Sequence, residues 1–347
     1  MNGTSLRRAA LSFALNLPDG LLRRIAGPVV TNDRGDILDL QTQALLTLSL
    51  KLKIPRLHTL PVEEARRQTV EDTALIGIEP PTMLAVHALT LPGSSVAMRH
   101  YDPGGLPPGA PLLLFGHGGG FVVGDLDSHD ICCRLFARDA RCHVLAVDYR
   151  CAPEHPFPAA TDDMLAAWRW VSTHAEELGA DPQRVVIGGD SAGGNLATVT
   201  CLRARDCGDP LPMGQLLIYP AVDMTHGMAS HQRFAEGFFL DAEMIAFFME
   251  RYLGADNRTH PDASPWHVES VAGLPPTVVI TAGFDPLRDE GEAWAERLRE
   301  ADVPVTARCE PNLVHGFMNM DGVAKEARAA NARMVADLRA LFGRPTS

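Results

Sequence analysis

The chain has 347 residues, a hydrophobic content of 46% and a formal net charge of −12 at pH 7. It is long enough to bury a full core, and its acidic balance argues against nucleic acid or an anionic membrane as the main partner. No stretch approaches the roughly 18 consecutive apolar residues of a transmembrane helix, so we expect no stable membrane insertion.

Residues 1–75 carry helical periodicity without strand signals, for example over 37–52 and 62–70. Near the start, Arg7-Arg8 and a short apolar run imitate a signal peptide. Asn16 and Pro18 interrupt that run, and no clear small-residue cleavage site follows. We therefore expect an amphipathic helix that stays on the protein, and a helical cap segment over 1–75.

From about residue 82 the pattern becomes an alternation of strands and helices. Strands are predicted at 83–91, 96–101, 111–115, 143–149, 184–188, 215–220, 277–282 and 305–309, and helices at 127–139, 159–178, 193–206, 288–301 and 325–341. Such alternation predicts a mostly parallel sheet with helices on both faces, and active sites lie at the carboxyl ends of its strands. We assign residues 76–223 and 255–347 to this α/β core.

Residues 224–254 break the alternation, since they lack a strand and are rich in large apolar side chains such as Phe238, Phe239 and Leu240. One interpretation is an ordinary amphipathic helix pair packed on the core. The other, which we favour, is a cap insertion that covers the strand ends together with the N-terminal helices and lines an acyl pocket.

Ser191 is the centre of a Gly-x-Ser-x-Gly pentapeptide, between the β-branched run that ends at Ile187 and a segment of helix-forming composition. Flanking glycines tolerate a strained strand-to-helix turn that would expose the hydroxyl near a helix N-terminus. Serine is also a favoured helix N-cap, so the pentapeptide alone leaves open whether Ser191 is a nucleophile or only a cap.

A serine nucleophile needs a base, and the base needs an acid that orients it. The order Ser, acid, His expected of this fold class is met by Asp285 after the strand at 277–282 and by His315 after the strand at 305–309. Asp289 and Glu310 are rival acids, but we expect the first inside a helix start and the second nearer the strand than the histidine.

The strand at 111–115 runs into Gly116-His117-Gly118-Gly119-Gly120-Phe121. Successive glycines let a backbone approach a substrate closely, and this HGGG-type loop is typical of the oxyanion site of lipases and esterases. We expect the N–H groups of Gly119, Gly120 and Ala192 to be the donors, with Gly118 as the alternate.

The motifs HGGGFVVGDLDSHD, DYRCAPEHPFPAATDD, GDSAGGN, DPLRDEG and HGF, in that order, resemble the bacterial hormone-sensitive-lipase family (family IV) of α/β hydrolases, in its GDSAG subgroup. The resemblance implies an eight-stranded α/β-hydrolase core with a helical cap, and hydrolysis of carboxylic esters with short to medium acyl chains. It gives the triad roles to Ser191, Asp285 and His315, has His117 brace the oxyanion loop, and makes a homodimer possible.

The prediction is a serine carboxylesterase that uses a small-molecule ester and needs no metal or other cofactor. An amidase or deacetylase acting on an N-acyl compound is the alternative on the same fold, and a non-catalytic ligand receptor is a third. Candidate pocket residues are apolar: Phe121, Phe238, Phe239, Leu240 and Phe317. The seven cysteines form neither a disulfide framework nor a C-x-x-C pattern, so we expect free thiols in the cytoplasm.

Overall fold

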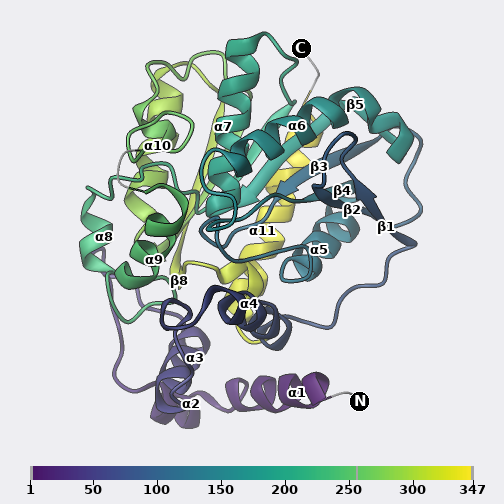
Figure 1. Ribbon diagram of the computed structural model, residues 1–347. Coiled ribbons are helices and arrows are strands. Elements are labelled where there is room, and N and C mark those ends of the chain that lie inside the picture. The colour runs from purple at the N-terminus through teal and green to yellow at the C-terminus, as the bar shows by residue number, and fades with distance from the viewer. Residues whose placement is uncertain (1–2, 255–256, 345–347) are drawn as a thin grey trace.

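The computed structural model describes residues 3–254 and 257–344; residues 1–2, 255–256 and 345–347 of the predicted segments lie outside the described residues. An eight-stranded sheet crosses the molecule in the order β1-β2-β4-β3-β5-β6-β7-β8 (Figure 1). Its strands are β1 (Ala85–Thr90), β2 (Ala97–Asp102), β3 (Ala110–Gly116), β4 (His143–Asp148), β5 (Ala180–Asp190), β6 (Gly214–Ile218), β7 (Thr277–Phe284) and β8 (Val305–Val314).

Strand β2 pairs antiparallel with β1 and β4, and the other neighbouring strands are parallel. The central strands are buried on both faces: Leu112 and Leu114 of β3 join one hydrophobic cluster, while Leu113 and Phe115 join the other. Two-sided burial explains why these strands appear in the sequence as continuous apolar runs rather than as alternating patterns. The predicted mostly parallel eight-stranded α/β-hydrolase sheet is confirmed.

Five long helices cover the two faces of the sheet (Figure 1). Side chains of α6, α7 and α10 pack in one hydrophobic cluster, and those of α5 and α11 pack in the other. Their bounds are α5 (Asp130–Ala140), α6 (Ala159–His174), α7 (Ala192–Cys207), α10 (Arg288–Glu300) and α11 (Lys325–Phe342), with short 3-10 turns η2 (Ala175–Leu178), η3 (Pro265–His267) and η4 (Phe317–Asn319).

Strands β5 and β8 extend furthest beyond their predicted ends. Strand β5 begins at Ala180 and continues past Gly188 to Asp190. A Cβ at Gly189 would collide with backbone atoms of Gly116 and Gly193, so glycine here serves close packing. Strand β8 continues to Val314, with a register irregularity against β7. We expected this strand to end at Cys309; that was wrong, and Pro311 lies within β8 because an edge strand accommodates proline.

The N-terminal segment holds four helices and a 3-10 turn: α1 (Gly3–Leu15), α2 (Asp19–Ala26), α3 (Leu40–Lys51), η1 (Leu57–Thr59) and α4 (Val62–Ile76). Three of its hydrogen-bond partners come from beyond residue 280 of the sequence. The Asn32 side chain donates to the Gly283 carbonyl, the Asp39 N–H donates to the Asn312 carbonyl, and the Lys325 N–H donates to the Gln41 side chain.

Residues 224–254 contain two helices, α8 (Ala229–Arg233) and α9 (Ala242–Tyr252), and no strand. Asp241 caps α9 by accepting the Met244 N–H at 2.8 Å and also accepts a 3.1 Å hydrogen bond from Arg56 of the N-terminal segment. The two segments that we expected to form a cap are therefore joined directly. No helix in the part of the chain that the structure describes is long and apolar enough to cross a membrane.

Candidate active site

Ser191 stands on a sharp turn between β5 and α7. Its backbone has φ 54° and ψ −115°, a conformation that non-glycine residues adopt at a cost of about 1–3 kcal/mol. Its N–H donates to the Ile218 carbonyl at 2.9 Å, and its carbonyl accepts the N–H groups of Asn195 and Ala221 at 3.1 and 3.2 Å. These three bonds hold the strained turn from both sides.

The glycines around Ser191 are required by packing. A Cβ at Gly193 would collide with the Gly116 backbone at the end of β3, and one at Gly194 would lie 2.9 Å from the Pro220 side chain. Because the first turn of α7 packs closely against the ends of the neighbouring strands, only glycine fits at positions 193 and 194. The serine is thereby brought to the carboxyl edge of the sheet.

His315 lies between Ser191 and Asp285. Its Nε2 is 3.0 Å from the Ser191 Oγ, and its Nδ1 is 2.8 Å from the Asp285 Oδ2. Asp285 is fully buried, and its other oxygen accepts the Leu287 N–H at 2.8 Å. A base within hydrogen-bond reach of a hydroxyl, itself held by a carboxylate, is the arrangement that activates a serine.

The rival acids lie elsewhere. Asp289 accepts the Ser230 N–H at 2.9 Å and pairs with Arg288, while Glu310 pairs with Arg308 and Arg333. Among the described residues, Asp285 is thus the carboxylate that meets His315.

The glycine-rich loop after β3 faces the same cavity. Gly119 and Gly120 have φ 113° and φ 60°, and a Cβ would collide with the Val123 carbonyl at the first and with the Phe248 ring at the second. No acceptor is recorded within the described residues for the N–H groups of Gly119, Gly120 and Ala192. Gly118 differs, because its N–H already donates to the Asp190 Oδ1 at 2.8 Å.

Asp190 and two histidines hold this loop. The Asp190 carboxylate lies 3.2 Å from the His129 Nε2. Burial alone would raise the pKa of Asp190, but the charge and hydrogen bond of His129 outweigh it and lower that pKa. His117 stacks on Tyr149 and lies with its Nδ1 2.8 Å from the Gly118 carbonyl, and burial lowers its pKa to about 4. A neutral His117 can donate from Nδ1, which agrees with the bracing position that the resemblance implied.

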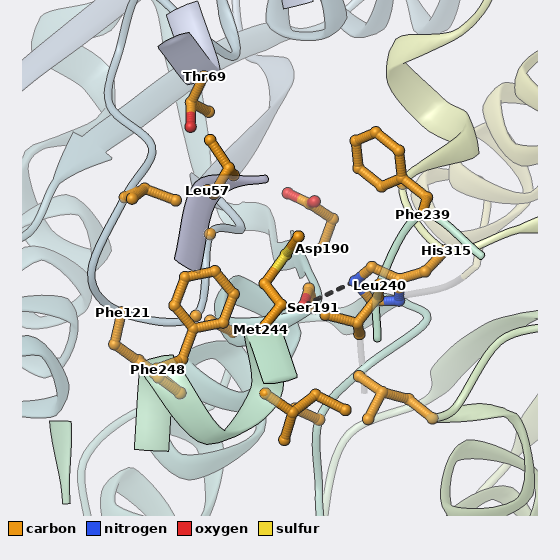
Figure 2. Close-up of a pocket in the computed structure, with 18 of the residues that line it drawn as sticks. Leu57, Thr69, Phe121, Asp190, Ser191, Phe239, Leu240, Met244, Phe248 and His315 are labelled. Atoms are coloured by element: carbon orange, nitrogen blue, oxygen red, sulfur yellow. Dashed lines mark hydrogen bonds between the residues drawn. The ribbon is translucent and has the colours of Figure 1, made fainter. Parts of the chain in front are cut away.

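A mostly apolar cavity of about 130 Å³ lies over Ser191 and His315 (Figure 2). Its walls come from the oxyanion loop, from η1 and α4 of the N-terminal segment, and from residues 239–249. Phe121, Phe239 and Leu240 are among the lining residues, as expected. Met244 and Phe248 also line it, from the segment that was expected to line an acyl pocket, whereas Leu57, Thr69 and Asp72 had not been singled out.

Two candidate pocket residues lie outside this lining. Phe238 packs against Phe234 and Phe284, with ring centroids 5.2 and 5.7 Å away, and borders a neighbouring cavity. Phe317 is fully buried behind the site, edge-on to Tyr219. Tyr219 in turn lies 4.5 Å from the His315 ring, so Phe317 supports the histidine from behind rather than facing the cavity.

Comparison with known sequences identifies the family. The profile of a family described by its alpha/beta hydrolase fold matches residues 113–319, more than half of the chain. The carboxylic ester hydrolase LipN of Mycobacterium tuberculosis is 45% identical over 265 residues, which are 74% of this chain and 70% of LipN. This chain belongs to the hormone-sensitive-lipase family of α/β hydrolases.

Other relatives cover similar shares. The ethyl acetate hydrolase of Pseudomonas putida is 39% identical over 79% of this chain and 88% of its own. Among solved structures, an α/β-hydrolase enzyme from the metagenome of Lake Arreo superposes with a TM-score of 0.84 at 40% identity, covering 88% of this chain and 99% of that one. The expected family membership is confirmed.

Sequence reasoning overlooked Asp190, His129 and Asp72. Asp190 was in view within Gly-Asp-Ser-Ala-Gly, but its partner Gly118 lies 72 positions away in the sequence. Asp72 left no motif at all, and its position on the cavity side of α4 follows only from the packing of the N-terminal segment.

Proposed function

We propose that the protein is a serine carboxylesterase in which Ser191 attacks the ester carbonyl while His315 takes its proton. Asp285 holds the imidazole and stabilises its positive charge. The protonated His315 then gives the proton to the leaving alcohol, and water, deprotonated by His315, releases the acid from the acyl-enzyme. The observation that carries the proposal is the continuous Ser191–His315–Asp285 chain, with contacts of 3.0 and 2.8 Å.

The N–H groups of Gly119, Gly120 and Ala192 are proposed to bind the oxyanion. All three belong to residues that line the cavity, and none of the three N–H groups has a recorded acceptor in the described part of the chain. Gly118 is not proposed as a donor, because its N–H is engaged by Asp190. Free donors held by a rigid loop stabilise the tetrahedral intermediate without reorganisation.

Short to medium acyl chains suit the site best. The lining of the cavity is largely apolar, its volume is about 130 Å³, and Leu240 and Met244 lie beside the nucleophile in it (Figure 2). The relatives named as hydrolases of carboxylic esters and of ethyl acetate support the same reaction. We propose that residues 1–75 and 224–254 form the cap of this cavity, over a core of 76–223 and 255–347.

The setting of the enzyme is also a proposal. All seven cysteines are free thiols, and Cys132, Cys133, Cys142 and Cys201 are buried, which fits the reducing cytoplasm. The net charge of −12 disfavours a nucleic-acid partner. A homodimer, which rests on the family resemblance alone, is tested by light scattering on the purified protein.

Hydrolysis of p-nitrophenyl esters from acetate to laurate, with the matching anilides, tests the activity. We expect turnover of the shorter esters, with anilides far slower, and labelling by a fluorophosphonate at Ser191. Ser191→Ala should lower kcat by roughly 10⁴-fold or more and abolish labelling. The matched control is Ser172→Ala, whose exposed hydroxyl donates only to the Arg169 carbonyl. Ester turnover that survives Ser191→Ala, or a preference for anilides, would contradict the proposal.

A further inference from the structure

Asp72 of α4 lies in the wall between two cavities. It lines the active-site cavity and also a neighbouring one of about 360 Å³ that is bordered by α3, α4 and residues 237–244. Leu57, Asp72, Phe239 and Met244 line both cavities, so these side chains lie at the boundary between them. The Asp72 carboxylate thus borders a route from Ser191 towards α3.

This carboxylate lacks a strong partner. Its recorded hydrogen bond, a long one at 3.4 Å, comes from the Gln68 Nε2 of the same helix. Within the described residues it makes no ion pair, and the nearby Arg56 is engaged by Asp241 at 3.1 Å. Burial raises the pKa of Asp72 to about 6, with a smaller contribution from the charge of Glu71. A half-buried carboxylate without a cation or strong donors is costly, and a bound hydrogen-bond donor would offset that cost.

The same side of α4 offers acceptors rather than donors. The Thr69 and Thr73 hydroxyls both line the active-site cavity and donate to helix carbonyls, at 2.8 Å to Ala65 and 3.0 Å to Thr69. Their oxygen lone pairs remain able to accept. Figure 2 shows the Thr69 hydroxyl directed towards the cavity beside the apolar Leu57. With Asp72 they form a strip of acceptors in an otherwise apolar wall, which suits a ligand that donates hydrogen bonds.

We propose that Asp72 is a specificity-determining residue that binds a hydrogen-bond donor, a hydroxyl or an ammonium group, at the end of the ester substrate remote from the scissile carbonyl. The inference rests on the proposed esterase function and names the substrate class, an ester with one polar donating end. The apolar middle of such a substrate would lie against Leu57 and Met244, and the flexible methionine can adjust to different chain lengths.

The neighbouring cavity provides room for that polar end. It is more polar than the active-site cavity, with Lys53, Arg56, Gln68 and Asp241 among its lining residues. A donor bound to Asp72 would therefore lie at the boundary between the apolar active-site cavity and the more polar neighbouring cavity. An alkyl end placed there would leave the carboxylate unsatisfied, so the site discriminates against purely aliphatic esters.

Matched p-nitrophenyl esters test the inference. The acyl chains, from butanoyl to octanoyl, end in methyl, hydroxyl or ammonium, and a parallel set of butyrates carries the same ends on the alcohol side. The quantity measured is the ratio of kcat/KM for the donor-ended ester to that for its methyl-ended counterpart. In Asp72→Asn we expect this ratio to fall by about tenfold for the chain length that reaches Asp72, because a hydrogen bond to a charged group is lost. If the ratio falls for the hydroxyl-ended esters, the donor is a hydroxyl; if it falls for the ammonium-ended esters, the donor is an ammonium group.

Glu64→Gln is the matched control, since Glu64 is an exposed acid of the same helix and does not contribute to the pKa of Asp72. It should leave the ratio unchanged. If the wild-type protein hydrolyses the methyl-ended esters and Asp72→Asn alters the ratio for neither donor in either set, the inference about Asp72 is wrong while the esterase function stands. If no ester of any kind is hydrolysed, the proposed function itself fails.

Discussion

At Gly120 the oxyanion loop runs against the Phe248 ring of α9, and a Cβ there would overlap ring atoms. The residue also has φ 60°, which costs a side-chain-bearing residue roughly 1–2 kcal/mol. Gly120→Ala should therefore lower kcat by about tenfold or more, because the displaced N–H of residue 120 no longer points at the oxyanion. Steady-state kinetics with a p-nitrophenyl ester measure this.

The clash and the backbone strain at Gly120 can be separated. In Gly120→Ala with Phe248→Ala the ring is gone, so part of the lost kcat should return relative to Gly120→Ala alone. A double variant no more active than the single one would mean that backbone strain, and not contact with α9, accounts for the loss.

The Asp285 carboxylate accepts a hydrogen bond from His315. Asp285→Asn keeps the side chain's shape but presents an amide to the His315 Nδ1, now 2.8 Å from the Asp285 Oδ2. The histidine is then held in the wrong tautomer, and kcat should fall by about 10⁴-fold with little change in KM. Asp289→Asn is the control, since Asp289 contacts Ser230 and Arg288 rather than His315. Equal losses in the two variants would speak against Asp285 as the orienting acid.

Arg66 of helix α4 makes hydrogen bonds to the segment that follows the oxyanion loop. Its guanidinium donates at 2.9 Å to the carbonyls of Val122 and Ala152 and pairs with Glu154 at 2.6 Å. The bond to Glu154 raises the pKa of Arg66, despite an opposing effect of burial. Since α4 also lines the cavity, this one residue links the N-terminal segment to the catalytic loop.

Arg66→Met should lower the free energy of unfolding by about 2 kcal/mol, since it removes hydrogen bonds from a charged donor, and should raise KM for esters more than it lowers kcat. Urea titration and steady-state kinetics provide the two measurements. Arg67→Met is the control, because Arg67 is exposed and its ion pair with Glu71 is long, at 4.0 Å. An unchanged KM in Arg66→Met would show that α4 keeps its place without this anchor.

At the scale of the whole molecule, the buried His100 makes the free energy of unfolding fall at acid pH. Burial, and next the charge of His143, lower the pKa of His100 to about 4 in the folded protein, against about 6.5 in the unfolded chain. The folded state thus favours neutral His100. The stability that this provides is complete above about pH 6.5 and is lost as the pH falls towards 4.

We therefore expect the wild-type protein to lose about 2 kcal/mol more unfolding free energy than His100→Gln between pH 7 and pH 5. Glutamine retains a donor for the His143 Nδ1, now 3.1 Å from the His100 Nε2, but cannot be protonated. Carboxyl groups with raised pKa, such as Asp148 at about 6, act in the opposite direction, but they cancel in the comparison. Exposed His155→Gln is the control; parallel pH curves for His100→Gln and wild type would contradict the expectation.

The sequence was most informative where chemistry and backbone geometry restrict the residue type. The glycines around Ser191 and in the HGGG run are needed by turns and close approaches, and such positions leave motifs. Neighbouring Phe238 and Phe239 could not be told apart, because residues 235–240 lie outside any helix or strand and thus lack a periodicity that would show which ring faces the cavity. Arg66 binds distant segments, and Asp72 borders a cavity that other parts of the chain complete, and no local pattern of one sequence records either fact.

The contacts of the N-terminal helices have a consequence for synthesis of the chain. Asn32, Asp39 and Gln41 find their partners at Gly283, Asn312 and Lys325, in the last quarter of the sequence. On the ribosome the N-terminal segment emerges first, yet it must wait for almost the whole chain before these contacts can form. Until then Asn32, Asp39 and Gln41 lack these partners, whereas Arg66 of α4 can already reach Val122 and Ala152. Residues 32–41 are thus made long before they can dock, and hydrolytic activity should appear only after the chain has been made as far as Lys325.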